Sequence, residues 1–390
     1  MDMITLSQDQ KLALDKLLYW YKSKNRPSHI TLGGYAGTGK TTLISLFRKK
    51  LNDIDPKLKV SFVTYTGKAA RVLEQKIQES ESMYPQDNVS TIHSLIYAPI
   101  INSKKEIAGW ELKDLINSNL IVVDEASMVD ERIWFDLLSF KLPILAVGDH
   151  GQLPPINGNF NLMKKPQIVL EQIHRQAQGN PIIKLSIMAR TKGHIPVGNY
   201  ADTVVKYNRT SSDSMENVGD LLASFDSDTM VLCGYNNTRT RLNKHIRQAL
   251  GFMGDYPEKG DQVVCLRNNY KTKVTNGMIG KIRTIEDEND DWYFAEIDFE
   301  GYSSKFRGLI SRGQFNSTNG LNFTQSRKKT LKGDLFDFGY ALTVHKAQGS
   351  QARRVILFEE RFRQMDDEAW RRWLYTAVTR AEESLVIIGG

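Results

Sequence analysis

The chain has 390 residues, and at roughly 100–200 residues per domain this length predicts two or three domains. Its 41% hydrophobic and 25% charged residues exclude a largely disordered chain, a collagen and a disulfide-stapled miniprotein. The 52 Lys and Arg residues against 45 acids give a net charge of +7, which is compatible with a polyanionic partner but does not prove one.

Short apolar runs alternate with helical patterns along most of the chain, which is typical of βαβ units around a mainly parallel sheet. Residues 7–22 predict an amphipathic helix, with Ser7 and Gln10 at the spacing of a capping box. Further elements of the first part are strands at 29–33, 60–65, 119–123, 143–147 and 167–170, and helices at 39–50, 66–79, 130–139 and 180–191.

Residues 195–227 are polar and rich in serine, which predicts a connection between two lobes. A second α/β set follows, with strands at 229–235, 336–341, 353–358 and 384–388, and helices up to 249 and at 366–380. Residues 259–333 lack a helical period and indicate a small β-barrel insertion. We therefore expect a first lobe at 1–227, a second lobe at 228–258 and 334–390, and an insertion at 259–333.

Two segments outside these lobes have distinct patterns. Residues 97–112 predict a hairpin that turns near Asn102. Within the β insertion the charges are segregated, with eight acids and no Lys or Arg at 286–300, and seven Lys or Arg and no acid at 301–333. We expect the basic segment, above all Arg327, Lys328 and Lys329, to approach a nucleic acid.

The text GYAGTGKT at 34–41 fits the phosphate-binding loop G-x-x-x-x-G-K-[ST], and it follows an apolar strand and precedes a helix. Its glycines let backbone N–H groups curl around phosphate oxygens. Lys40 can reach the β- and γ-phosphates, and the Thr41 hydroxyl can bind Mg²⁺. A glycine-rich structural turn would explain the glycines but not the Lys-Thr pair.

Two adjacent acids, Asp124 and Glu125, end the apolar run Leu120–Val123. In a P-loop protein the strand edge holds Mg²⁺ through such an aspartate, and the glutamate is placed to orient or deprotonate the attacking water. The alternative is a cap for the helix at 130, but Asp130 and Ser127 are better placed for that role. Further on, Gln152 follows an apolar strand and two glycines, where its amide is a candidate sensor of the γ-phosphate; a plain polar turn before Pro154 is the alternative.

Further short motifs occur in a fixed order along almost the whole chain: TYTGKAARVL (64–73), STIHSL (90–95), VVDEASMVD (122–130), AVGDHGQLPPI (146–156), HRQ (174–176), GYALTVHKAQGS (339–350) and YTAVTRAEESL (375–385). In this order the chain resembles a superfamily 1 helicase of the 5′→3′ branch, the RecD-like group. The resemblance implies two RecA-like P-loop NTPase lobes with a β-hairpin (pin) insertion and a small SH3-like β-barrel insertion. Polarity follows from the text TVHKAQGS and not from residue chemistry.

The resemblance also implies the ligands of ATP and Mg²⁺. The residues that bind ATP are then Gln10, Gly37, Thr38, Gly39, Lys40, Thr41, Thr42 and Gly349, and those that bind Mg²⁺ are Thr41 and Asp124. Gln10 has two open roles, the adenine contact of the family and the helix cap. Arg175 and Arg380 are candidate arginine fingers, because charge that develops on the transferred phosphoryl group is stabilised by a planar cation from outside the P-loop.

DNA contacts are implied for three polar clusters on the two lobes: Thr66 and Lys68; Thr91 and His93; and Thr343, His345 and Lys346. Thr66 opens a helix after a strand, which is a phosphate site on its own physical grounds. For a lone histidine a place in the core is the usual alternative. The pin would present Tyr97, Ile100, Ile101 and Trp110, although an ordinary hairpin can also pack such side chains on itself.

The sequence therefore predicts an ATP-dependent DNA helicase that moves along single-stranded DNA and opens duplexes. Two alternatives stay open: a translocase or remodelling ATPase that does not unwind, and a nucleic-acid-binding module that uses ATP as a structural ligand. Expected partners are single-stranded DNA, junctions of single- and double-stranded DNA, and replication or recombination proteins. We expect a monomer without a membrane partner in a bacterial or phage-infected cytoplasm, since no run approaches the ~20 apolar residues of a membrane span and no signal peptide is present.

Overall fold

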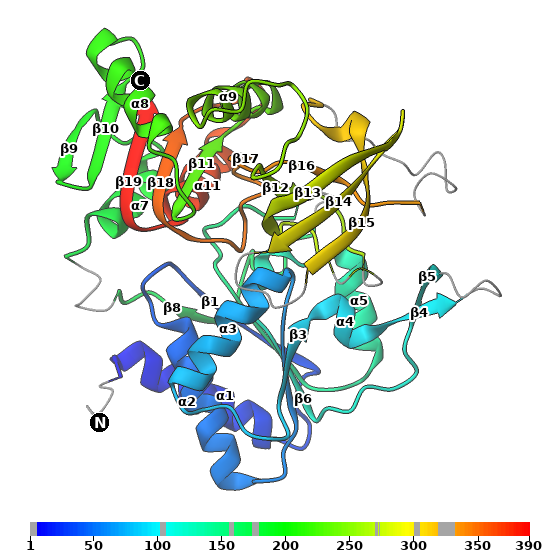
Figure 1. Ribbon diagram of the computed structural model, residues 1–390. Coiled ribbons are helices and arrows are strands. Elements are labelled where there is room, and N and C mark those ends of the chain that lie inside the picture. Colours follow the sequence, from blue (N-terminus) through cyan, green and yellow to red (C-terminus); the bar gives the residue numbers. More distant parts are fainter. Residues whose placement is uncertain are drawn as a thin grey trace. The chain divides into compact units, whose positions relative to one another are not determined.

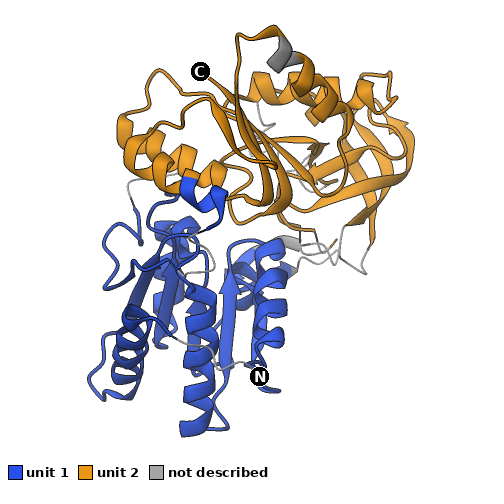
Figure 2. Cartoon of the chain, turned by 90° about the vertical axis from the view of Figure 1, so that its left-hand side faces the viewer, with its two compact units in different colours: residues 1–184 blue, residues 185–390 orange. Residues whose placement is uncertain are grey.

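The computed structural model describes residues 6–101, 107–155, 160–173, 179–269, 272, 274–299, 305–318 and 332–390 (Figure 1). The chain divides into two compact units, unit 1 (Met1–Lys184) and unit 2 (Leu185–Gly390), which Figure 2 colours separately. Each unit is built around a six-stranded sheet of its own. In the described part of the chain, no helix has both the length and the apolar character needed to cross a membrane.

The sheet of unit 1 is parallel throughout, with the strand order β3-β2-β6-β7-β1-β8. Its strands are β1 (His29–Gly34), β2 (Val60–Thr64), β3 (Asn88–Thr91), β6 (Leu120–Val123), β7 (Ile144–Gly148) and β8 (Ile168–Leu170). Every residue of β2, β6 and β7 is buried, as expected for central strands that helices cover on both faces. Because all six strands run the same way, the loops after them meet at one edge of the sheet.

The helices of unit 1 begin where the sequence places caps. They are α1 (Gln8–Lys22), α2 (Lys40–Ile54), α3 (Gly67–Glu79), α4 (Ile92–Ile96), α5 (Glu131–Ser139) and the short 3₁₀ helix η1 (Ala126–Met128), while α7 (Pro181–Lys192) contains the division between the units. The side chains of Thr66 and Asp130 cap α3 and α5, and Ser7 forms the predicted capping box with Gln10.

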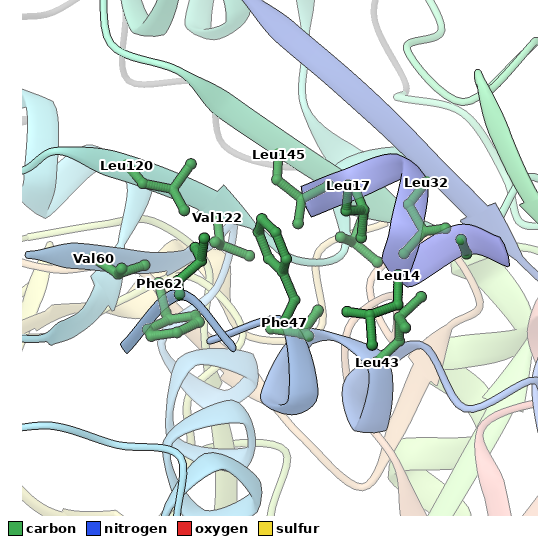
Figure 3. Close-up of a cluster of buried hydrophobic side chains, with 14 of the residues drawn as sticks. Leu14, Leu17, Leu32, Leu43, Phe47, Val60, Phe62, Leu120, Val122 and Leu145 are labelled. Atoms are coloured by element: carbon green, nitrogen blue, oxygen red, sulfur yellow. The ribbon is translucent and has the colours of Figure 1, made fainter. Parts of the chain in front are cut away.

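One face of this sheet packs against α1 and α2 (Figure 3). Leu17 of α1 and Phe47 of α2 are almost fully buried against the sheet residues Leu32, Phe62 and Leu145. Each such side chain stabilises the fold by about 1.5–3 kcal/mol relative to an exposed position. This core holds α2 in place below the loop that joins it to β1.

Unit 2 has a second α/β sheet with the order β17-β11-β18-β19-β10-β9. Its strands are β9 (Gly198–Ala201), β10 (Val204–Asn208), β11 (Thr229–Cys233), β17 (Ala341–Thr343), β18 (Ala352–Phe358) and β19 (Ala381–Gly389). All pairings are parallel except that of β9 with β10. The helices of this unit are α8 (Ser212–Ala223), α9 (Asn236–Ala249) and α11 (Asp367–Val378).

The structure differs from the expected connection at 195–227 and from the expected end of the first lobe at residue 227. That segment contains β9, β10 and α8, and β10 pairs with β19 from Val204 to Asn208. The division between the units falls instead after Lys184. The physical reason is position, because strands at the edge of a sheet bury fewer side chains and so keep the polar composition of a loop.

Two all-β parts complete the chain. A two-stranded sheet, the β4–β5 hairpin, consists of β4 (Tyr97–Ile101) and β5 (Ile107–Leu112) and agrees with the predicted hairpin. A five-stranded antiparallel sheet with the order β15-β14-β13-β12-β16 lies in unit 2 and fits the predicted β insertion. Its elements are β12 (Gln262–Cys265), β13 (Ile279–Asn289), β14 (Trp292–Phe299), β15 (Lys305–Ser311), β16 (Phe336–Phe338) and the 3₁₀ helix η2 (Arg312–Gln314).

Buried ion pairs join α9 to the antiparallel sheet. Arg247 of α9 donates to both carboxylate oxygens of Asp261, over 2.8 and 2.9 Å, and Asp261 also accepts from the Tyr340 hydroxyl at 2.8 Å. The Asp261 side chain is 0% exposed and that of Arg247 3%. One turn of the helix away, Arg239 donates to Asp337 at 2.8 Å. The antiparallel sheet is therefore fixed to the second α/β sheet by charges that each need their partner.

We expect Asp261→Ala to destabilise unit 2 by about 3–5 kcal/mol, because it leaves the Arg247 charge buried without compensation. The matched control is Asp255→Ala, since Asp255 pairs with Lys244 of the same helix at 2.9 Å but both side chains are exposed. Urea unfolding followed by circular dichroism measures both variants. Equal unfolding midpoints for the two would contradict a structural role for the buried pair.

Candidate active site and DNA-contact residues

The P-loop connects β1 to α2 through two glycines in the left-handed region. Gly37 has φ +80° and Gly39 has φ +74°, a region that other residues enter only with strain. Gly34 has a steric requirement, because a Cβ atom there would lie 2.6 Å from the Thr38 hydroxyl oxygen. No side chain caps α2, so its first N–H groups keep the orientation that binds an anion.

Lys40 reaches back across this loop. Its ammonium group donates to the carbonyl oxygens of Gly34 at 2.7 Å and Tyr35 at 3.1 Å. The Thr38 hydroxyl donates to the same Tyr35 carbonyl at 2.8 Å, which closes the loop on itself. The ammonium is thus held within the cradle of backbone N–H groups, where a β- or γ-phosphate would lie.

The acidic pair lies on the next strands of the same edge. Asp124 directly follows β6, and β6 and β1 both pair with β7. Loss of solvation and the neighbouring Glu125 raise the pKa of the Asp124 carboxyl, whereas the Lys40 ammonium lowers it. Two close carboxylates and the Thr41 hydroxyl form an oxygen-rich donor set of the kind that Mg²⁺ prefers, so the residues fit that ion.

Glu125 has an unusual backbone conformation. Its φ of +52° and ψ of +38° place it in the left-handed region, as the residue that precedes η1. For a residue other than glycine this conformation costs of order 1–3 kcal/mol and is concentrated at functional sites. The sharp turn it makes directs the chain away from the strand immediately after Asp124.

The turn after β7 approaches the P-loop from the other side. Asp149 is buried and accepts from the Gly151 N–H at 2.9 Å, and its carbonyl accepts from the Gln152 N–H at 3.2 Å. The ring of His150 lies 4.2 Å from that of Tyr35 in the P-loop. The predicted sensor Gln152 is therefore held in a turn that contacts the P-loop, and the polar-turn interpretation describes its backbone without excluding that role.

Gln10 combines a cap with a P-loop contact. Its side-chain oxygen accepts from the Ser7 N–H at 3.1 Å, and its side-chain nitrogen donates to the Thr38 carbonyl at 3.1 Å. The residue is fully buried. The capping prediction is confirmed, whereas the adenine contact stays a prediction. The link from α1 to the P-loop was not predicted from the sequence.

The two candidate arginine fingers have different outcomes. Arg175 lies outside the described residues. Arg380 is buried in unit 2, where its guanidinium donates to the carbonyls of Thr376 and Ser350, each at 3.0 Å. Ser350 follows Gly349, which has φ +72°. The structure thus brings Arg380 and Gly349 together within unit 2, at the meeting point of two of the predicted motifs.

Both DNA-contact clusters of unit 1 lie at neighbouring strand ends. Thr64 of β2 is in register with Thr91 of β3, so the Thr66 turn and α4 are adjacent. Thr66 and Thr91 cap α3 and α4 with their side chains, and Lys68 lies in the first turn of α3. Burial lowers the pKa of His93, whose ring lies 6.0 Å from that of Tyr65 and 5.6 Å from that of Tyr97.

The third cluster follows β17 in unit 2. Thr343 ends the strand, and burial lowers the pKa of His345. Lys346 donates to the side-chain oxygen of Asn276 at 3.2 Å. Asn276 precedes Gly277, whose φ of +89° makes the turn between β12 and β13. The Asn-Gly pair announced this turn, but nothing in the sequence indicated that it would contact Lys346.

The β4–β5 hairpin exposes two of the four predicted pin residues. Ile100 and Trp110 are 41% and 39% exposed, whereas the side chain of Ile101 and residues 102–106 lie outside the described part. Tyr97 differs from the expectation of an exposed stacking surface, because it is only half-buried at the base of the hairpin and donates its hydroxyl to Asp136 of α5. It is the first residue of β4 and so anchors the strand.

The described cations of the basic segment are paired within the antiparallel sheet. Arg312 pairs with Asp287, Arg307 with Glu296 at 3.2 Å, and Lys305 with Asp298 at 3.5 Å. The opposite charges that are segregated along the sequence therefore meet across neighbouring strands. The run Arg327, Lys328 and Lys329, to which we assigned the approach to nucleic acid, lies outside the described residues.

Comparisons with known proteins agree with this arrangement. A family model described as an AAA domain matches residues 21–158, and one described as a UvrD-like helicase C-terminal domain matches residues 338–388. The ATP-dependent RecD2 DNA helicase of Deinococcus radiodurans is 27% identical over 414 residues, which cover 98% of this chain and 49% of that protein. The ATP-dependent DNA helicase dda of Enterobacteria phage T4 is 23% identical over 446 residues, which cover 96% of this chain and 97% of that protein.

Among solved structures, Bacteroides Pif1 bound to ssDNA aligns with a TM-score of 0.55 at 17% identity, over 99% of this chain and 92% of that one. A structure of Pif1 helicases at forked dsDNA aligns with a TM-score of 0.56 at 17% identity, over 98% and 92%. At such identities the likeness shows the fold alone, which is that of a P-loop NTPase with two RecA-like lobes.

With the family models and the relatives taken together, the chain belongs to the RecD-like group of superfamily 1 helicases, the 5′→3′ branch. It spans about half the length of the RecD2 protein, 49%, and nearly all of the phage protein, 97%.

Proposed function

We propose that this chain is an ATP-dependent DNA helicase that moves 5′→3′ on single-stranded DNA and separates duplex DNA with the β4–β5 hairpin. The observation that carries the proposal is the meeting of three features at one edge of the unit 1 sheet: the P-loop, the Asp124-Glu125 pair and the turn that holds Gln152. Relatives that align with 98% and 96% of the chain are named ATP-dependent DNA helicases, which supports the choice among P-loop activities.

In this proposal the P-loop residues from Gly37 to Thr42 bind the phosphates of ATP, and Thr41 and Asp124 hold Mg²⁺. The ion, when bound, neutralises charge on the β- and γ-phosphates. Glu125 orients the attacking water and takes its proton. Arg175 and Arg380 stabilise the negative charge that develops on the transferred phosphoryl group, with Gly349 as a further nucleotide contact.

Movement follows from the placement of DNA-contact clusters on both lobes. Thr66, Lys68, Thr91 and His93 would hold the strand on unit 1, and Thr343, His345 and Lys346 on unit 2. If ATP binding closes the lobes and hydrolysis reopens them, alternating grip by the two sets converts each cycle into a step along the strand. An arginine finger on unit 2 makes hydrolysis depend on closure.

The two all-β parts would act on the strands themselves. We assign the β4–β5 hairpin as the pin that meets the duplex, with Ile100 and Trp110 as its exposed apolar side chains. The antiparallel sheet of unit 2 is assigned as the SH3-like insertion, at 259–333, within the second lobe. The relatives in bacteria and a phage support a monomeric motor in a bacterial or phage-infected cytoplasm, acting with replication or recombination proteins.

The decisive test is unwinding of duplexes that carry a single-stranded tail at either the 5′ or the 3′ end. We expect ATP-dependent separation of the strands with the 5′ tail and little or none with the 3′ tail. A preference for the 3′ tail would overturn the branch assignment. Translocation without separation of either substrate would instead identify a remodelling ATPase, and no DNA-stimulated ATP turnover would identify a module that binds ATP as a structural ligand.

A further inference from the structure

The β4–β5 hairpin forms a sheet of only two strands, separate from the parallel sheet of unit 1. In Figure 1 it reaches away from that sheet beyond α4 and α5. An isolated two-stranded hairpin is marginally stable in water at best. The pairing register also shifts between Ile100 and Ile101. A hairpin of this kind can bear load only if its base is held by the rest of the lobe.

Lys113, the residue after β5, holds one end of that base. Its ammonium donates to the carbonyl oxygens of Ser94 at 2.8 Å and Leu95 at 2.9 Å, and its backbone N–H donates to the carbonyl of Ile96 at 2.8 Å. These are the carbonyls at the C-terminal end of α4, which otherwise lack a partner within the helix and favour a cation. The second strand of the hairpin is therefore tied to the helix that directly precedes the first.

Tyr97, the first residue of β4, holds the other end. Its hydroxyl donates to the Asp136 carboxylate of α5, and its ring contacts the ring of His93 in α4. His93 in turn contacts Tyr65, the neighbour of Thr66. Both ends of the hairpin are thus connected to the elements that carry the DNA-contact residues of unit 1.

We propose that Lys113 and Tyr97 are positioning residues that clamp the β4–β5 hairpin to α4, so that the hairpin moves with the part of unit 1 that grips the strand. This inference rests on the proposed helicase function. Opening DNA works against stacking of about 1.4 kcal/mol per base-pair step. A hairpin whose base yields would bend under that load instead of transmitting it, while grip and ATP turnover continue.

The test is Lys113→Met, which keeps the apolar stem and removes the donor, in the full chain. We expect the unwinding rate of a 5′-tailed duplex to fall roughly tenfold, as for the loss of a hydrogen bond that involves a charged group. DNA-stimulated ATP hydrolysis and translocation on single-stranded DNA should stay within about twofold of wild type, since no nucleotide ligand changes. Lys113→Arg, which can donate to the same carbonyls, should restore unwinding, and Tyr97→Phe should reduce unwinding in the same selective way.

The control is Lys50→Met, which removes an exposed lysine of α2 and should leave all three rates unchanged. The salt dependence of single-strand binding separates the clamp from direct contact, because a lost phosphate contact lowers the slope by about one. A lowered slope in Lys113→Met, or unwinding equal to wild type, would overturn the clamp.

Hydrogen exchange over residues 107–112 keeps this inference separate from the proposed function. Faster exchange in Lys113→Met than in wild type is expected and would support the clamp even if the wild-type chain proved unable to unwind. In that case the proposed function fails and the clamp does not. Unchanged exchange would reject the clamp whatever the unwinding assay shows.

Discussion

Replacing Lys40 with alanine is expected to abolish ATP hydrolysis, both basal and DNA-stimulated, with a loss of at least about 100-fold. The ammonium is held in the P-loop by the carbonyls of Gly34 and Tyr35, at the position where the β- and γ-phosphates would lie. Its removal takes away the one side-chain cation of the P-loop motif. Steady-state release of phosphate with and without single-stranded DNA measures the effect.

The fold should survive this change, because the hydrogen bonds described for the Lys40 ammonium end within its own loop. Circular dichroism and a urea unfolding curve check that expectation. Lys50→Ala is the matched control, since Lys50 lies on the same helix and its side chain is 58% exposed. Undiminished hydrolysis by Lys40→Ala would sink the proposed ATPase mechanism and leave a module that binds nucleotide without using it.

The parallel sheet and the nucleotide site of unit 1 were predictable because each of their signals is local. Strands such as Val60–Thr64 are buried on both faces and so appear as unbroken apolar runs. The P-loop spacing requires particular glycines within a few residues of Lys40, and the Ser7 cap lies three residues from Gln10. Such patterns are visible in a short window of sequence and depend little on the remainder of the chain.

The contacts missed by sequence reasoning join residues far apart in the chain. Lys346 and Asn276 meet only because β17 and the β12–β13 turn are brought together, and Arg247 and Asp261 meet only through the packing of α9. For Lys113 the separation is shorter, but its partners are backbone carbonyls, which carry no sequence signal. Tertiary partners of this kind cannot be read from periodicity or spacing.

The charge of the β insertion illustrates the same limit. The sequence displays an acidic block followed by a basic block, which suggests one surface of each sign. In the antiparallel sheet the two blocks form neighbouring strands, so Arg312 and Arg307 pair with Asp287 and Glu296. Exposed pairs of this kind add little stability, but they neutralise the potential around the described cations. A basic surface for DNA would therefore have to come from other residues.

Glu125→Gln is expected to stop hydrolysis while leaving ATP binding in place. The amide keeps the shape of the side chain but cannot take a proton from water, and general-base catalysis contributes about 10²–10⁴-fold to rates of this kind. Phosphate release measures hydrolysis, and the fluorescence of a labelled nucleotide measures binding. The contrast with Lys40→Ala, which should weaken both, separates catalysis from phosphate binding. Glu131→Gln, at an exposed position in the first turn of α5, is the matched control.

The backbone of Glu125 provides a second, independent readout. Because its φ is +52°, a glycine at this position should relieve the left-handed strain and stabilise unit 1 by about 1 kcal/mol or more. The same Glu125→Gly variant should hydrolyse ATP no faster than Glu125→Gln, since both lack the carboxylate. A more stable but inactive protein is the result expected where a strained residue is kept for its chemistry. Full hydrolysis in either variant would show that the base lies elsewhere, and an unchanged unfolding midpoint in Glu125→Gly would show that this turn stores no strain.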